Sequence, residues 1–231
     1  MVQMNNEKPR LRVKFKKIGN LQYVSHLDLV RTMHKTLVRS KLPLWYTEGF
    51  NPKPKMSFAA PLSIGTESVA EYMDVILTER VSTDEVVKAL NSNMTEEMQV
   101  IEAYYPETKF TDLAWLSYTI LIKSENISRE LAEACENLLN GEKIEILKNT
   151  KSGEKIVDIR PLIKSASSVL DGDVIRISAC LSADPSTFLN PEYLIKALRD
   201  KLGILTSSDL TKEEYSIKRE RAYFADMTEF R

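Results

Sequence analysis

The sequence predicts an α+β protein of two ferredoxin-like halves packed together, each with the order β-α-β-β-α-β. Three observations support this prediction. Each half contains segments of alternating apolar residues separated by segments of helical periodicity, capping residues precede the helical segments, and Phe110–Ala114 forms a short linker. We therefore expect a flexible N-terminus at residues 1–9, a basic domain at residues 10–109 and a second domain at residues 115–231.

The first half begins with an expected strand at Leu11–Ile18, where apolar and basic residues alternate and the outer face should be wholly basic. Ser25 and Asp28 then form a capping box for a helix that continues to about Ser40. An apolar stripe should bury this helix, and its members are Leu27, Val30, Met33, Leu37 and Val38. The remaining expected elements are a strand at Met56–Leu62, a strand at Ala70–Leu77, a helix at Ser82–Asn91 and a strand at Met98–Tyr105.

The second half repeats this plan with little residue identity to the first. Gly141 and Gly203 follow its two expected helices, as C-terminal glycines do. A hairpin is expected around a turn at residues 149–153, and it supplies two of the strands. The expected elements are Leu116–Lys123, the helix Ser128–Asn140, the hairpin strands Lys143–Leu147 and Lys155–Ile159, Val174–Leu181, a helix from Asn190 to Gly203, and Tyr215–Phe224.

The composition is that of an ordinary soluble protein, with 43% hydrophobic and 28% charged residues. No apolar run is long enough to span a membrane and no secretory signal is visible, so we expect a cytoplasmic protein without a membrane partner. Cys135 and Cys180 are expected to be buried thiols. No metal-ligand spacing and no nucleotide-binding glycine motif occurs, so no metal and no cofactor is expected on this chain.

The formal net charge of −1 conceals an uneven distribution. Residues 1–63 contain twelve Lys and Arg residues against three acidic residues, a net charge of +9, whereas residues 64–231 have a net charge of −10. Basic side chains gathered on one surface gain free energy by displacing counterions from phosphates. This distribution favours a polyanion as the partner of the first half. Two alternatives would produce the same charge distribution: a solvated basic face, or a basic face that packs against the acidic remainder of the chain.

A stiff basic loop should protrude after the first helix. Gly49 permits a positive φ, and Pro52 and Pro54 hold the loop extended in the stretch GFNPKPK. Basic residues also recur on one face of the first helix, and exposed aromatic rings in the loop could stack on bases of single-stranded RNA. The predicted nucleic-acid-binding residues are Arg31, Lys35, Arg39, Tyr46, Phe50, Lys53 and Lys55.

The two histidines of the chain, His26 and His34, both fall on the first helix. The helix N-terminus favours the neutral form of His26, which could then act as a general base on a ribose hydroxyl, with Tyr23 or a lysine assisting. The alternative is a capping-region histidine with a structural role. His34 is expected to be a packing or surface residue.

The stretch from Tyr23 to Val75 resembles the radical-SAM-associated protein family, a domain of unknown function. The resemblance lies in SHLD at residues 25–28, GFNPKPK at residues 49–55 and GTESVAEY at residues 65–72, and VDIRPLI at residues 157–163 extends it. It implies a radical SAM enzyme as partner, because such domains are encoded beside or fused to cobalamin-binding radical SAM enzymes. The iron–sulfur cluster and S-adenosylmethionine would then belong to that partner.

A weaker resemblance is to CRISPR repeat-processing endoribonucleases, which are also paired ferredoxin-like domains. This sequence lacks the glycine-rich loop that those enzymes carry near the C-terminus. Three hypotheses follow from the sequence. The first is a non-catalytic accessory domain that presents an RNA, such as a tRNA or rRNA, to a radical SAM modification enzyme. The second is a metal-independent endoribonuclease that uses His26, and the third is a protein-only adaptor for the radical SAM partner. The first is the main prediction, so the chain itself is expected not to be an enzyme.

Overall fold

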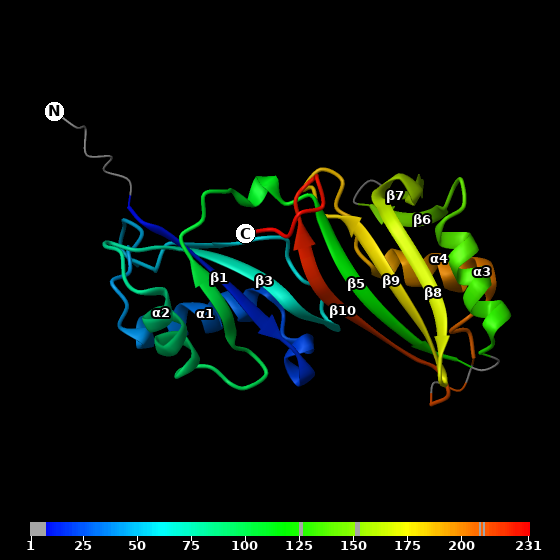
Figure 1. Cartoon of the computed structure of the whole chain (residues 1–231), viewed down its shortest axis with the longest axis horizontal. Helices are drawn as coiled ribbons and strands as arrows, with labels where there is room; N and C mark the ends of the chain where they lie inside the picture. Colours follow the sequence, from blue (N-terminus) through cyan, green and yellow to red (C-terminus); the bar gives the residue numbers. More distant parts are fainter. Residues whose placement is uncertain (1–7, 125–126, 151–152, 208, 210) are drawn as a thin grey trace. The chain divides into compact units, whose positions relative to one another are not determined.

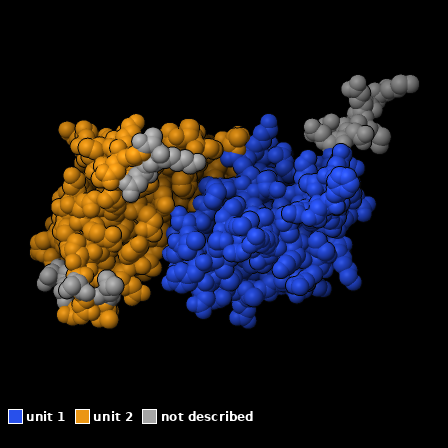
Figure 2. Space-filling model, turned by 180° about the vertical axis from the view of Figure 1, so that it is seen from behind, with its two compact units in different colours: residues 1–110, 231 blue, residues 111–230 orange. Residues whose placement is uncertain are grey.

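A computed structural model describes residues 8–124, 127–150, 153–207, 209 and 211–231. The chain divides into two compact units, residues 1–110 with residue 231, and residues 111–230 (Figure 2). The strands in each unit pair in antiparallel fashion and four α-helices occur in the described parts of the chain, so the α+β class is confirmed. Most of the N-terminal segment that was expected to be flexible, residues 1–7, lies outside the described residues.

Over residues 8–110, the first unit contains four strands and two α-helices (Figure 1). Its strands follow the spatial order β4-β1-β3-β2, and each neighbouring pair is antiparallel. A short 3-10 helix at Gly19–Tyr23 precedes α1. The bounds are β1 Arg10–Lys17, α1 His26–Ser40, β2 Met56–Phe58, β3 Thr66–Ile76, α2 Thr83–Asn91 and β4 Val100–Tyr104. β2 is therefore shorter than the expected strand Met56–Leu62.

The hydrophobic core of this unit lies between its strands and its helices. Alternate residues of β1 and β3 point to that core, as a strand with one buried face requires. Ser25 caps α1 by accepting a hydrogen bond from the Asp28 amide at 3.2 Å, as the sequence predicts. The core side chains of the two helices are Leu29, Met33, Leu37, Val86 and Leu90.

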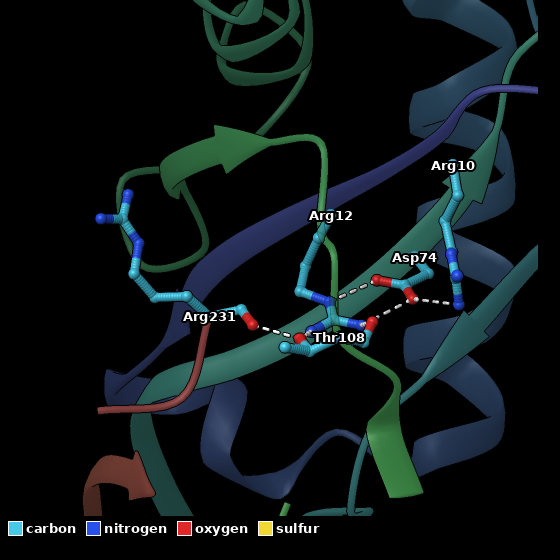
Figure 3. Close-up of polar contacts among 5 residues, drawn as sticks. All are labelled: Arg10, Arg12, Asp74, Thr108 and Arg231. Atoms are coloured by element: carbon cyan, nitrogen blue, oxygen red, sulfur yellow. Dashed lines mark hydrogen bonds and ion pairs between the residues drawn. The ribbon is translucent and has the colours of Figure 1, made fainter. Parts of the chain in front are cut away.

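The other face of β1 carries the predicted basic residues, but not all of them are exposed to solvent. Arg12 is completely buried, and Asp74, its partner across the β1–β3 ladder, accepts two hydrogen bonds from the guanidinium, at 2.7 and 3.0 Å (Figure 3). The chain after β4 covers the pair, because Arg12 also donates to Thr108 and lies 4.4 Å from the Phe110 ring centroid. Lys17 is buried too and donates to main-chain carbonyls of residues 21, 22 and 24. These two cations are therefore unavailable to a ligand.

The apolar stripe of α1 also differs from the prediction. Leu27 and Val38 are more than half exposed, whereas Leu29 and Thr36 are buried beside Met33. The buried face is thus rotated from the predicted one, because the six apolar residues of this helix allow more than one choice of face.

The second unit has the strand order β10-β5-β9-β8, again with antiparallel neighbours (Figure 1). β6 and β7 form a separate two-stranded sheet, so the expected hairpin exists but does not supply strands to the main sheet. Residues 151 and 152 of its expected turn lie outside the described residues. The bounds are β5 Trp115–Lys123, α3 Arg129–Leu139, β6 Glu145–Thr150, β7 Gly153–Asp158, β8 Ile163–Asp171, β9 Val174–Ser182, α4 Glu192–Leu202 and β10 Glu214–Tyr223.

Strand β8 was missed by the sequence analysis. Its sequence IKSASSVLD contains small polar residues where a strand prediction looks for β-branched or aromatic ones. It forms a strand because β9 pairs with it in antiparallel fashion from Ile163 to Asp171, with one irregularity between Ile163 and Ser165. Cys135 and Cys180 are buried, as predicted. No helix within the described ranges has the length and apolarity needed to cross a membrane.

Candidate nucleic-acid interface

The proline loop between α1 and β2 is an ordered, hairpin-like projection. The Thr47 amide donates to the Lys53 carbonyl at 2.8 Å, and the Lys53 amide donates to the Thr47 hydroxyl at 3.1 Å. Gly49 adopts a φ of +118° at the turn, a conformation that other residues rarely adopt, and Phe50 beside it is fully exposed. The loop therefore presents an unpartnered aromatic ring at its tip.

The loop and α1 together enclose a groove of about 300 Å³. Its cationic side chains come from both segments, Lys35 and Arg39 from α1 and Lys53 from the loop. No acidic residue lines it, and none of these three cations forms an ion pair with a carboxylate among the described residues. The lining residues are His34, Lys35, Val38, Arg39, Tyr46, Pro52, Lys53 and Pro54.

His34 links the helix to the loop. Its ring hydrogen-bonds the Pro54 backbone carbonyl, which favours the charged form of the ring. Partial burial acts more strongly in the opposite direction, and the positive charge of Lys53 adds to it, so the pKa of His34 is lowered. His34, which was expected to be a packing or surface residue, is half-buried and lies in the wall of the groove.

Two other residues of the predicted interface lie outside the groove. Arg31 donates to Asp28 at 3.0 Å on the same helix, and this hydrogen bond helps to lower the pKa of Asp28, for which the Ser25 hydroxyl is the larger cause. Lys55 lines a different hollow. Four of the seven predicted binding residues therefore meet in one groove, and Phe50 stands at the loop tip beyond it.

The histidine of the nuclease hypothesis also lies apart from the groove. His26 is exposed in the first turn of α1, and its ring packs edge to face on Phe58 at 5.4 Å between centroids. Tyr23 is 64% exposed in the short 3-10 helix before α1. No described group of three or more His, Cys, Asp or Glu side chains has a metal-binding arrangement.

A second, larger hollow was not predicted. It has a volume of about 780 Å³ and lies where the start of β1 meets the end of β3 and the segment after β4. Arg80 and Tyr105 reach it from outside residues 1–63, and no pattern in the sequence connects them with Lys8. The lining residues are Lys8, Pro9, Arg10, Trp45, Lys55, Ile76, Arg80, Tyr105, Pro106 and Glu107.

Comparison with models of protein families identifies the family of this chain. A family model described as "Uncharacterized protein conserved in bacteria (DUF2344)" matches residues 10–191. The chain belongs to this family. Membership in the DUF2344 family confirms the prediction of a domain of unknown function, and the family description mentions no enzyme partner. No curated protein matches the sequence.

Solved structures resemble this DUF2344 chain in fold. A chain of the "Crystal Structure of a Cbf5-Nop10-Gar1 Complex" has a TM-score of 0.51 and 12% sequence identity, over 92% of this chain and 48% of that one. A chain of the "Crystal structure of the archaeal box H/ACA sRNP Nop10-Cbf5 complex" has a TM-score of 0.46 at 12% identity, over 93% and 48%. An unknown protein from Galdieria sulphuraria has a TM-score of 0.26 at 10% identity, over 92% and 99%. The chain spans about half the length of the first two.

Proposed function

We propose that this protein is a non-catalytic RNA-binding accessory domain whose groove between α1 and the proline loop holds the backbone of a single-stranded RNA. The observation that carries the proposal is the convergence of Lys35, Arg39 and Lys53 on one groove without an acidic lining residue. When these cations displace the counterions condensed around RNA phosphates, the released counterions favour binding irrespective of base sequence.

The aromatic residues favour a single strand over a duplex. Phe50 is fully exposed at the loop tip and Tyr46 lines the groove, so both are accessible from solvent. Unpaired bases can stack on such rings, and each stack contributes about 1–3 kcal/mol. Bases within a duplex are already stacked on each other and cannot use these rings.

The proposal takes each unit as one ferredoxin-like half. The first unit supports this view. Its elements follow the order β-α-β-β-α-β, and its antiparallel strands lie in the spatial order β4-β1-β3-β2, which is the order of a ferredoxin-like sheet. The second unit has the equivalent order β10-β5-β9-β8 once the β6-β7 hairpin is counted as an insertion. The resemblance of residues 23–75 to the radical-SAM-associated family supports a radical SAM modification enzyme as the enzyme to which the RNA is presented.

Fluorescence anisotropy with a labelled single-stranded oligoribonucleotide tests the binding. Reversing two groove charges in the variant Lys35→Glu/Lys53→Glu should weaken binding by at least roughly tenfold at low salt. The matched control is Lys88→Glu, which reverses an exposed charge on α2 that does not line the groove. Equal binding by the double variant and the wild type, or no binding at low salt, would contradict the proposal.

The other two hypotheses predict different results. Cleavage of the RNA in the presence of a chelator, with 2′,3′-cyclic phosphate ends that disappear in His26→Ala, would establish the endoribonuclease instead. A protein-only adaptor would co-purify with the radical SAM enzyme after nuclease treatment, and the Lys35→Glu/Lys53→Glu variant would lose that association. The RNA-presenting domain should bind RNA without cleaving it.

A further inference from the structure

We propose that the 780 Å³ hollow at the start of β1 is a binding site for a nucleoside phosphate, either the phosphorylated end of an RNA strand or a free nucleotide. This inference rests on a site separate from the groove described above. The hollow has the volume of a small-ligand pocket and is lined by four cationic side chains against one carboxylate, that of Glu107. The excess of positive charge suits a terminal phosphate, which carries close to two negative charges at neutral pH, better than the single charge of an internal phosphodiester.

The cations are available to a ligand. Within the described residues, Lys8, Lys55 and Arg80 form no ion pair with a carboxylate. Arg10 has one distant contact, with Asp74 at 4.0 Å, whose carboxylate is already engaged by Arg12. Among the described residues, an anionic ligand would therefore not have to displace a carboxylate from three of the four cations.

Aromatic rings hold two of these cations in place. The Lys8 ammonium lies 4.6 Å from the Trp45 ring centroid, and the Arg80 guanidinium lies 4.4 Å from that of Tyr105. The Tyr105 hydroxyl also accepts a hydrogen bond from the Val81 amide and donates one to the Val81 carbonyl, so it fixes the segment that carries Arg80. Side chains that are already positioned lose less conformational entropy when a ligand binds.

The walls of the hollow are joined by main-chain hydrogen bonds. The Trp45 amide donates to the Ile76 carbonyl at 2.9 Å, the Ile76 amide to the Lys55 carbonyl at 3.0 Å, and the Leu77 amide to the Pro9 carbonyl at 2.8 Å. This frame brings three distant segments of the chain to one place. Arg80 is exposed, so a base attached to the phosphate can stack on its guanidinium, as RNA bases do on arginine.

Binding of matched ligands tests the site. The probes are one short single-stranded oligoribonucleotide with a 5′-phosphate, the same strand with a 5′-hydroxyl, and adenosine 5′-monophosphate, titrated by calorimetry into the full chain. We expect the 5′-phosphorylated strand to bind at least roughly tenfold more tightly than the hydroxyl strand, the effect of one additional phosphate contact. Saturable binding of the mononucleotide alone would identify a free nucleotide as the ligand.

Variants separate this site from the groove. Lys8→Ser/Arg80→Ser should abolish the preference for the phosphorylated strand and the binding of the mononucleotide, while general RNA binding remains. Lys35→Glu/Lys53→Glu should weaken both strands equally and keep the preference, and Lys88→Ser is the control. No preference for the phosphate and no mononucleotide binding by the wild type would overturn the inference, even if the groove binds RNA. A preference that survives in Lys8→Ser/Arg80→Ser would overturn it too.

Discussion

Replacing Asp74 by Asn should strongly destabilise the first unit. Arg12 is fully buried and Asp74 is 4% exposed, and the two are joined by a bidentate pair of hydrogen bonds at 2.7 and 3.0 Å. The variant removes the carboxylate charge that faces a buried guanidinium, and breaking such a pair costs about 3–5 kcal/mol. Asparagine still offers one acceptor oxygen and Thr108 still accepts from Arg12, so we expect a loss of about 3 kcal/mol in the free energy of unfolding.

Tryptophan fluorescence during denaturant unfolding measures the free energy of unfolding of the first unit. The chain has two tryptophans, Trp45 in the first unit and Trp115 in the second, so a Trp115→Phe background leaves Trp45 as the reporter. The control is Arg12→Met/Asp74→Leu, which removes both charges and should recover most of the lost stability. A loss below about 1 kcal/mol in Asp74→Asn, or a double variant as unstable as the single one, would refute the reasoning.

Three further predictions concern single side chains. The pKa of His34 is lowered in the folded chain, so the unfolded chain binds a proton at this residue more readily, and the free energy of unfolding should fall as the pH drops below about 6.5. NMR titration should show a higher pKa of His34 in Lys53→Gln and after addition of RNA. An unchanged pKa in both cases would contradict this prediction. Phe50→Ala should weaken RNA binding by about 1–3 kcal/mol without changing the melting temperature, and equal affinity would exclude stacking. Burial raises the pKa of the Cys135 thiol to about 11 and also raises the pKa of Cys180. Both thiols should therefore react with a thiol reagent at pH 8 only after unfolding. Rapid labelling of the folded chain would contradict their burial.

The sequence predicted best those features that depend on local chemistry. Ser25 caps α1 as expected, and Gly49 and Phe50 form the expected protruding turn, because capping and turn conformations are determined by a few neighbouring residues. Lys35 and Lys53 meet in one groove because the helix face and the proline loop are separated by only a short segment of chain. The basic surface of the first unit could therefore be anticipated in part.

Features that depend on distant segments could not be predicted. Arg12 alternates with apolar residues as a solvent-facing cation would, but the segment around Thr108 folds back over it and helps to bury it. The hollow near Lys8 likewise requires Arg80 and Tyr105, which β3 and β4 bring to the start of β1. Strand β8 has weak local strand propensity and is recruited by its partner β9.

The salt dependence of RNA binding tests the central claim most directly. The logarithm of the association constant should fall linearly with the logarithm of salt concentration, with a slope of about 0.7 for each phosphate contacted on a single strand. Neutralising Lys35, Arg39 and Lys53 together as serines should therefore reduce the magnitude of the slope by about 2. Lys88→Ser should leave the slope unchanged. A triple variant with the slope of the wild type would show that the groove between α1 and the proline loop does not hold the RNA.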